Sequence, residues 1–362
     1  MSKISFKSNA TGTGKFVFEA PSTNTDRTLT LPDEDGTIVT SNDGAIKLPT
    51  GTTAERPTNP VGGMIRYNTD EEYVEYYDDV QEQWFPTKSV SVEATGGTVT
   101  DITQNGVNYR VHAFTSSGTF EVTSAPNDAE VEYLIVAGGG GGGGGYYGGG
   151  GGAGGLLTGL ETVTTGSKPI IVGSGGNGGV DRDDEGKNGN DSSALSYVAI
   201  GGGGGGGRNT GNGSSGGSGG GAARPGDAGG SGTPGQGNDG GTNLSNAGGT
   251  YASGGGGADE IGGVPDTTYG VNQSGSIGAP GGNGVSSLIS GSSTFYSGGG
   301  GGGARDTGTN PIGGDGGGGD GGKFTPGENA TPNTGGGGGG GGGQDDAGGD
   351  GGSGIVIIRY PI

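Results

Sequence analysis

The sequence predicts an all-β protein in which small N-terminal β modules precede a β base that carries a bundle of glycine helices. Three observations support this fold class. Apolar and polar residues alternate with a period of two in short runs over the first 136 residues, as in half-buried strands. The chain holds 102 glycines among 362 residues, and all but 11 follow position 137. Short apolar runs separate the glycine tracts, so these tracts are anchored at intervals.

Residues 1–44 form the first expected unit. "KISFKS" places Ile4 and Phe6 on one face, and "RTLTLPDEDG" places Leu29 and Leu31 together before a turn. A three-stranded piece of this size buries little apolar surface by itself. We therefore expect it to serve in attachment or oligomerisation, with its core formed against copies of itself.

Residues 45–97 form the second expected unit, a small β module. Two prolines precede a run rich in tyrosine, "MIRYNTDEEYVEYYDDVQEQWFP", which is typical of a hairpin or meander. Five aromatic residues gather within 73–85. Such residues suit a sugar-binding surface, but we expect them to form the aromatic core of the module.

Residues 98–362 form the third expected unit, a glycine-rich domain on a base of β-strands. Strands are expected near 107–137, 169–173, 195–200 and 355–360, and those at 131–137, 169–173, 195–200 and 355–360 are expected to pair. The single histidine, His112, falls on the more polar face of its strand. With no second histidine and no cysteine, it belongs to no catalytic or zinc-binding set of residues.

The glycine tracts predict ordered helices rather than a flexible linker. Ordering glycine is costly in backbone entropy, so long tracts need a compensating interaction. In a polyglycine II helix, which has three residues per turn like polyproline II, the peptide groups point outward. Neighbouring helices without Cβ atoms can then hydrogen-bond to one another, each bond contributing about 0.5–1.5 kcal/mol. Side chains are expected at the tips and on the outer faces of such a bundle.

Composition excludes several classes of function. Apolar residues make up 26% of the chain, against about 45–50% in globular proteins. The formal net charge of −21, with 17 Lys and Arg, disfavours nucleic acid and anionic membranes as partners. No cysteine is present to form a disulfide. The N-terminal residues lack a signal-peptide pattern, and we expect folding in a cytoplasm.

Several stretches resemble a known family. "ATGTGKFVFEAPSTNTDRTLTLPDEDGTI" resembles N-terminal segments of bacteriophage tail-fibre proteins, and "GTTAERPTNPVGGMIRYNT" resembles a recurrent tail-fibre β module. "VHAFTSSGTFEVTSAPNDAEVEYLIVAGGGGGGGG" and "GGSGIVIIRYPI" resemble the glycine-rich domain of phage fibres and adhesins. The resemblance implies a virion fibre, usually homotrimeric, that attaches by its N-terminus to other virion proteins and binds a host receptor.

Aromatic and arginine residues beside the glycine tracts are the candidate receptor-binding residues. Aromatic faces stack on sugars, and the arginine fork binds carboxylate or phosphate groups of surface polysaccharides. Phe295 and Tyr296 fit either a tip or a base strand. The candidates at loop tips are Tyr146, Tyr147, Arg208, Tyr251, Arg305 and Phe324.

The acidic run at 181–191 raises the question of a metal. Asp181, Asp183 and Asp184 supply oxygen ligands that calcium prefers, although neither an EF-hand register nor a repeated nonapeptide is present. A solvated acidic loop is the alternative, and we expect no other cofactor. Paired carboxylates also occur in glycosidases, but no apolar pocket is evident to tune one of them, so no enzymatic activity is expected.

The sequence thus predicts a fibre protein of a virion, assembled in the host cytoplasm and acting at the host cell surface. Its rigid glycine-rich domain presents loops that bind a host glycan or protein. The alternative is a structural subunit that polymerises into an extracellular filament by adding its N-terminal strands to a neighbour's sheet.

Overall fold

The structure is a computed structural model. It describes residues 48–87, 91–126, 129–181, 183–244, 251–265, 279–305 and 310–362. The expected N-terminal unit, 1–44, lies outside the described residues. Within them the chain forms strands and one short 3-10 helix, with no α-helix and no closed barrel, in agreement with the predicted all-β class.

Residues 48–87 form a small four-stranded sheet. Strand β1 runs parallel to β2, and β2, β3 and β4 form an antiparallel meander. Turns rich in Asp, Glu and Gly join the strands, as the alternating pattern predicts. The elements are β1 (Thr50–Gly51), the 3-10 helix η1 (Thr53–Glu55), β2 (Ile65–Asn68), β3 (Tyr73–Asp78) and β4 (Gln83–Pro86).

The aromatic residues of this module do not form the expected core. Among residues 48–87, the buried residues are Arg66, Asn68 and Glu75, all polar. Every aromatic side chain from 73 to 85 is half-buried or exposed. A single small sheet has two faces and too little chain to cover both, which is the physical reason for the difference.

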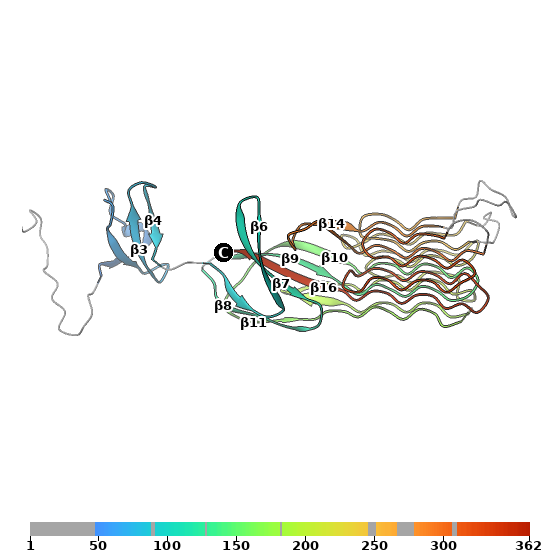
Figure 1. Ribbon diagram of the computed structural model, residues 1–362. Coiled ribbons are helices and arrows are strands. Elements are labelled where there is room, and N and C mark those ends of the chain that lie inside the picture. The colour runs from blue at the N-terminus through green and yellow to red at the C-terminus, as the bar shows by residue number, and fades with distance from the viewer. Residues whose placement is uncertain are drawn as a thin grey trace, which may run out of the picture.

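The remaining strands form the base from which the glycine-rich segments project (Figure 1). A five-stranded sheet has the order β10-β9-β16-β7-β6, and a three-stranded sheet has the order β11-β8-β5. Two short hairpins, β12-β13 and β14-β15, complete the base. The strands are β5 (Glu93–Thr95), β6 (Thr98–Gln104), β7 (Val107–Phe114), β8 (Gly118–Ser124), β9 (Glu130–Val136), β10 (Leu156–Thr162), β11 (Gly166–Ile170), β12 (Ser192–Ala194), β13 (Tyr197–Ala199), β14 (Val285–Ser287), β15 (Thr294–Tyr296) and β16 (Ile355–Pro361).

The pairing of the base strands differs in part from expectation. β16 pairs with β9, as expected for 355–360 and 131–137. β11 instead pairs with β8, and β13 pairs with β12, so the segments near 169–173 and 195–200 lie outside the sheet of β9. β5, which falls within the expected 45–97 module, pairs with β8 of the base.

The apolar core lies on both faces of the five-stranded sheet. On one face, Phe120, Val131, Ile135 and Ile358 pack between this sheet and the sheet of β8. On the other face, Leu134 and Ile357 belong to a second cluster, which includes residues of the β14-β15 hairpin. Strands covered on both faces are nearly continuous apolar runs, which accounts for "YLIV" in β9 and "IVII" in β16.

His112 is buried, contrary to its expected place on a polar face. Its side chain is fully enclosed, with Nδ1 2.8 Å from the carbonyl oxygen of Gly96 and Nε2 3.0 Å from the hydroxyl of Tyr360. The ring packs edge-on against Phe120. The strand alternation could not show this, because β7 lies in a sheet that is covered on both faces.

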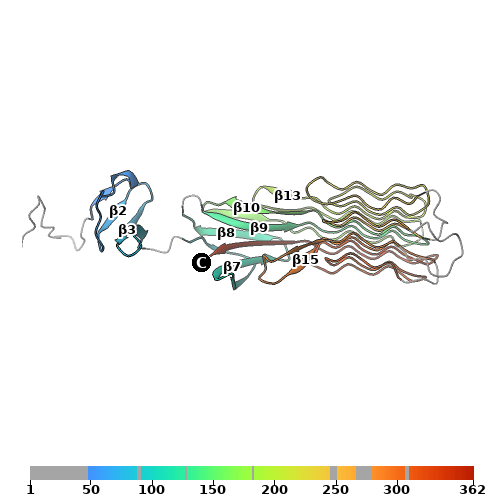
Figure 2. The same ribbon diagram turned by 90° about the horizontal axis from the view of Figure 1, so that it is seen from above.

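The glycine-rich segments run side by side away from the base as long, extended rods (Figures 1 and 2). We call each such segment a rod. The rod Gly138–Gly145 leaves β9, turns at the far end, and returns as 148–155 into β10. All eight glycines of this first rod are buried.

Hydrogen bonds donated by the rod Gly138–Gly145 repeat every three residues. One series of N–H groups donates to carbonyl oxygens of residues 184–190, at positions three apart. A second series donates to 346–352 and the third to 149–152, in the same steps. A residue repeat of three therefore aims successive N–H groups at three different neighbours.

The carbonyl groups of this rod point at three further neighbours. They accept from N–H groups of residues 176–179, 202–205 and 338–341, again at intervals of three. The rod Gly138–Gly145 is thus bonded to six surrounding segments through its backbone alone. This satisfies the buried peptide groups, which would otherwise carry a large desolvation cost.

Side chains on the outer rods follow the same period. In 173–180, Ser174, Asn177 and Val180 are exposed, whereas Gly173, Gly176 and Gly179 are buried. An outer rod therefore needs glycine only on the side that meets its neighbours. Side chains on outer faces agree with the expectation from the sequence.

Candidate functional site

The candidate site lies at the distal end of the rods, which we define as the end opposite the base. The rods are joined there by short turns that carry the non-glycine residues. Described distal turns lie at 145–148, 207–211, 223–227, 323–325 and 343–346, and Asp181, Asp183 and Asp184 lie at the same end.

Backbone bonds between rods bring three distal segments together. Gly303 N–H donates to Gly148 O at 2.8 Å, and Gly148 N–H donates to Gly341 O at 3.1 Å. These bonds place residue 305 and residue 344, which follow their rods, beside the turn at 145–148. The turn itself needs backbone with positive φ, at Gly145 (φ 77°) and Tyr147 (φ 68°).

Four side chains make contact where these segments meet. Arg305 lies over the ring of Tyr146, with Cζ 4.6 Å from the ring centroid. The hydroxyl of Tyr146 donates to Oε1 of Gln344 at 2.9 Å. The rings of Tyr146 and Tyr147 lie 6.1 Å apart. We name Tyr146, Tyr147, Arg305 and Gln344 the distal cluster.

The distal cluster presents a cation and two aromatic rings to solvent. A hydrogen bond with Tyr147 is the main cause that raises the pKa of Arg305, and its guanidinium remains charged. Arg305 is exposed, and both tyrosines are partly exposed. Such a surface can stack on an apolar or sugar face and bind an acidic group beside it.

Phe324 lies in the turn next to the distal cluster. Residues 304 and 323 form a parallel bridge, and Gly342 N–H donates to Thr325 O at 3.1 Å. Phe324 is 53% exposed and has a positive φ of 51°. It adds a further exposed aromatic ring to the same end of the bundle.

The other two candidate receptor-binding residues have different surroundings. Tyr251 is bridged to Ala304, close to Arg305, but its side chain is only 6% exposed. Arg208 is half-buried in the turn 207–211, which follows a rod adjacent to 149–155. Tyr251 therefore presents little surface to a partner, and Arg208 belongs to a separate turn.

Phe295 and Tyr296, which fitted either a tip or a base strand, lie in β15 at the base. Tyr296 is buried in the second core cluster, and Phe295 is 44% exposed. Gln344, in contrast, was not among the candidates. Its position directly after the nine-glycine tract 335–343 is the signal that could have identified it.

Backbone N–H groups bind the acidic residues Asp181 and Asp184. Asp183 N–H donates to the carboxylate of Asp181 at 3.1 Å, and Gly144 N–H donates to Asp184 O at 2.9 Å. Across the described residues, no three His, Cys, Asp or Glu side chains gather in a way that could hold a metal ion. The described residues thus give the calcium interpretation no support.

Comparison with known proteins matches residues 115–361 to a family model described as a glycine-rich domain. No curated protein matches the chain. In the part of the chain that the structure describes, no helix has the length and apolar character needed to cross a membrane. The matched region includes the base strands from β8 onward, all the described rods and the distal cluster.

Proposed function

The chain belongs to the glycine-rich domain family, and we propose that it is a virion tail-fibre adhesin whose rods hold distal turns against a host receptor. The observation that supports this proposal most is the distal cluster. Residues far apart in the sequence meet there because backbone hydrogen bonds join the rods that carry them. Binding residues commonly lie on loops that a rigid scaffold positions.

We propose that the rods are polyglycine II helices. The backbone hydrogen bonds between rods repeat every three residues. This repeat supports the proposal, because three residues per turn is the period of that helix. The burial of every third residue on outer rods supports it as well. A bundle of such helices is stiff, because each rod is hydrogen-bonded to its neighbours along its length.

We propose that the receptor is a host surface glycan or a surface protein. Tyr146 and Phe324 supply aromatic faces, and Arg305 supplies a fixed positive charge on a chain with a net charge of −21. An anionic polysaccharide group suits the arginine, and a sugar ring or apolar side chain suits the aromatic residues. The role is binding, with no catalysis and no cofactor.

We further propose that the protein is a homotrimer, attaches to other virion proteins through its N-terminus and is assembled in the host cytoplasm before acting at the cell surface. The resemblance of residues 10–38 and 51–69 to tail-fibre segments supports this part. If this proposal is right, the purified chain should form finite oligomers. Long threads in negative-stain micrographs would instead support the filament-forming alternative.

The experiment compares cell binding by the fluorescently labelled chain and two variants on a panel of intact bacterial strains. The variant Tyr146→Ala with Arg305→Ala removes the stacked ring and the cation of the distal cluster. The matched control, Phe295→Ala, removes an exposed aromatic ring at the base. We expect the first to lose binding by at least about tenfold, as loss of an aromatic or arginine anchor does. Equal binding by all three proteins would contradict the proposal.

A further inference from the structure

The outer rods differ from the inner rods in having one side without a further rod. An inner rod such as Gly138–Gly145 is bonded to six surrounding segments, whereas an outer rod has peptide groups that face away from the bundle. A row of unpaired N–H groups is a template on which another chain can add, as at the edge of a β-sheet. The acceptors of these outward N–H groups therefore decide whether a bundle can grow sideways.

The rod 201–207 has one series of N–H groups that is bonded to side chains. Its other two series donate to backbone carbonyl oxygens of neighbouring rods. In the third series, Gly201 N–H donates to Oδ1 of Asp191 at 2.8 Å. Three residues later, Gly204 N–H donates to Oδ1 of Asn188 at 2.9 Å. Side-chain oxygens thus take the place that the carbonyl oxygens of a further rod have in the interior.

The surface rod 227–232 is closed by side chains on two sides. From 228 to 232 every N–H group is bonded, and only that of Gly230 donates to a backbone oxygen. The other four donate to side-chain oxygens at 2.8–3.3 Å, which belong in order to Asn212, Thr242, Ser215 and Asp239. Two of these acceptors lie three residues apart on one neighbouring rod, and the other two lie three apart on another.

The same kind of bond occurs on other outer rods. The donor and acceptor residues are Gly178 with Asp350, Asp350 with Asn329, Gly313 with Asp320 and Asp315 with Asn283, at 2.7–2.9 Å. Among the described backbone bonds, none joins these rods to 227–232. Side-chain acceptors for backbone N–H groups therefore recur at separate places on the outside of the bundle.

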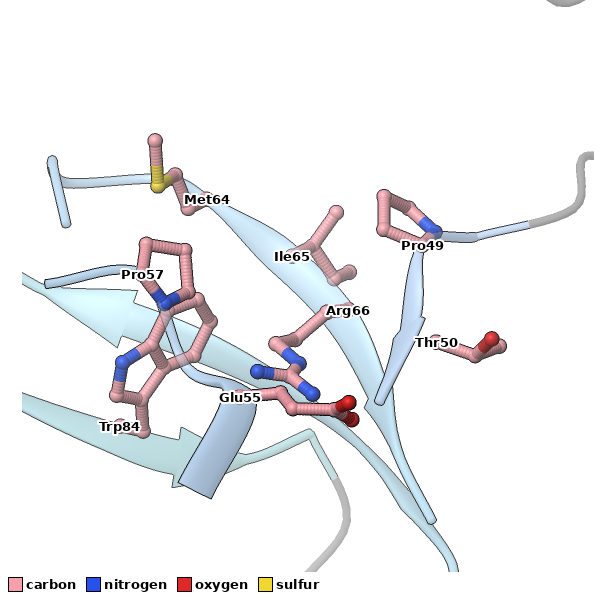
Figure 3. A pocket seen from close by; sticks show the side chains of 8 residues that line it. All are labelled: Pro49, Thr50, Glu55, Pro57, Met64, Ile65, Arg66 and Trp84. Carbon is pink, nitrogen blue, oxygen red and sulfur yellow. The ribbon is translucent and has the colours of Figure 1, made fainter. Parts of the chain in front are cut away.

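The small sheet of 48–87 closes the end of its edge strand in a similar way. β1 is an edge strand of that sheet, and in Figure 3 the carboxylate of Glu55 is directed toward the end of β1. This carboxylate accepts a hydrogen bond from Thr52 N–H at 2.8 Å. Asp70 accepts one from the next N–H group, that of Thr53, at 2.8 Å. Polar side chains thus bond open backbone donors outside the bundle as well.

The Cβ atoms of such side chains also limit how closely another rod can approach. Interior rods are so close that a Cβ atom built on Gly205 would overlap the carbonyl oxygen of Gly149. A residue other than glycine on the outer side of a rod therefore excludes a further rod at this spacing. An Asn, Asp, Ser or Thr at such a position both bonds the outward N–H group and keeps a second chain at a distance.

We propose that these side chains are lateral stops, which prevent the glycine-rich domain of one chain from adding rods of a second copy. The inference rests on the bonds between rods and is independent of the receptor and the distal cluster. Charge acts in the same direction, because stops such as Asp191, Asp239 and Asp350 place carboxylates on the outside of a chain whose net charge is −21.

Water alone would satisfy the outward N–H groups without stopping growth. A hydrated N–H group exchanges its water for a carbonyl oxygen of another chain at little net cost, because one hydrogen bond replaces another. A side chain that is anchored on its own rod must first be displaced. The lateral stops therefore change the balance between a separate bundle and a joined one, beyond satisfying the peptide groups.

The test compares two variants at the same positions of the full chain by sedimentation velocity. Asn212→Gly with Ser215→Gly removes two acceptors and two Cβ atoms beside rod 227–232. The matched control, Asn212→Thr with Ser215→Thr, keeps an oxygen acceptor and a Cβ atom at both positions. We expect the glycine variant to form larger species at a concentration at least about fivefold lower than the parent does, the factor for two weak net hydrogen bonds. The threonine variant should sediment like the parent.

Amide hydrogen exchange of 227–232 in dilute solution shows whether the glycine variant has freed the N–H groups. Exchange as slow as in the parent would overturn the inference, because the side chains would then not be the acceptors. Faster exchange with sedimentation equal to that of the parent at every concentration would overturn it as well.

A second comparison applies if the double glycine variant does not fold. Asn329→Gly removes the acceptor of Asp350 N–H, and Asn329→Thr keeps an oxygen acceptor and a Cβ atom there. The inference predicts larger species for Asn329→Gly alone. Equal sedimentation of these two variants at every concentration would contradict it.

Discussion

Close backbone contact explains most of the glycines in the rods. A Cβ atom built on Gly204 would overlap the carbonyl oxygen of Gly186, and one on Gly339 would overlap that of Asp320. Neither glycine has a positive φ. Glycine is needed at these positions because the neighbouring rod leaves no room for a Cβ atom. At other positions, such as Gly145, glycine is needed for the positive φ of a turn.

We expect Gly204→Ala to destabilise the bundle, because the new methyl group must push two rods apart. Overpacking of this kind costs about 1–3 kcal/mol or more. The matched control is Gly118→Ala in β8, where a Cβ would meet only the Phe114 ring at 3.6 Å, an ordinary contact. Thermal unfolding followed by circular dichroism measures both. A Gly204→Ala midpoint equal to that of Gly118→Ala would show that the rods are not closely packed.

His112 predicts a pH dependence of stability. Nδ1 faces a carbonyl oxygen, so it carries the proton, and Nε2 accepts from the Tyr360 hydroxyl, which itself accepts from Ala94 N–H at 3.1 Å. Burial is the main cause that lowers the pKa of His112. The unfolded chain, with a pKa of about 6.5, therefore binds more protons, and stability present above this pH is lost as the pH falls below it.

Denaturant unfolding at pH 7 and pH 5 tests this expectation. The parent should lose more stability over this interval than His112→Gln, which has no proton to gain. Equal losses in the two proteins would mean that protonation of His112 does not matter.

Residue-level prediction from the sequence succeeded where a residue interrupts a glycine tract. Tyr146 and Tyr147 lie in the distal turn expected for them. Tyr251 is buried, and His112 is enclosed by two sheets. Burial of these two depends on which segments become neighbours, and this information is absent from local sequence patterns.

The last strand, β16, is the element that closes the base. It lies at the centre of the five-stranded sheet, between β9 and β7, although it is the final strand in the chain. Arg359 of this strand binds Glu132 of β9 with Nε and Nη2, both at 2.7 Å. Its Nη1 donates to Gln104 at 2.6 Å and to Leu288 O at 3.1 Å.

We expect Arg359→Met to cost about 2–4 kcal/mol, because it leaves several partners of a buried guanidinium unpaired. The matched variant is Arg110→Met, which removes the paired 2.8 Å contacts with Asp101 on the exposed part of the same sheet. That exposed pair contributes at most about 1 kcal/mol. Denaturant midpoints measure both changes, and a larger loss from Arg110→Met would contradict this assignment.

The strands themselves were predictable from the sequence more readily than their partners. Alternating or continuous apolar residues marked the regions of β7, β8, β9 and β16. The pairing of β11 with β8 was not predictable, because two sheets pack face to face and either could accept that strand. The exposed aromatic side chains of 48–87 were also misassigned, since a sequence pattern does not show how many layers a small module has.

At the scale of the whole molecule, the rod Gly138–Gly145 occupies the middle of a set of six bonded neighbours. Their residues come from 149–152, 176–179, 184–190, 202–205, 338–341 and 346–352. The distal cluster depends on this arrangement, because the same bonds align the ends of the rods. A disordered glycine tract would leave Tyr146, Arg305 and Gln344 without a common frame.

Amide hydrogen exchange, followed by mass spectrometry of the full chain, tests this arrangement most directly. If the rods are cross-bonded, the amides of 138–145 and 335–342 exchange as slowly as those of β9 and β16, while the exposed turn at 208–210 exchanges rapidly. Exchange of 138–145 at the rate of an unstructured peptide would contradict the ordered bundle and, with it, the presentation of the distal cluster.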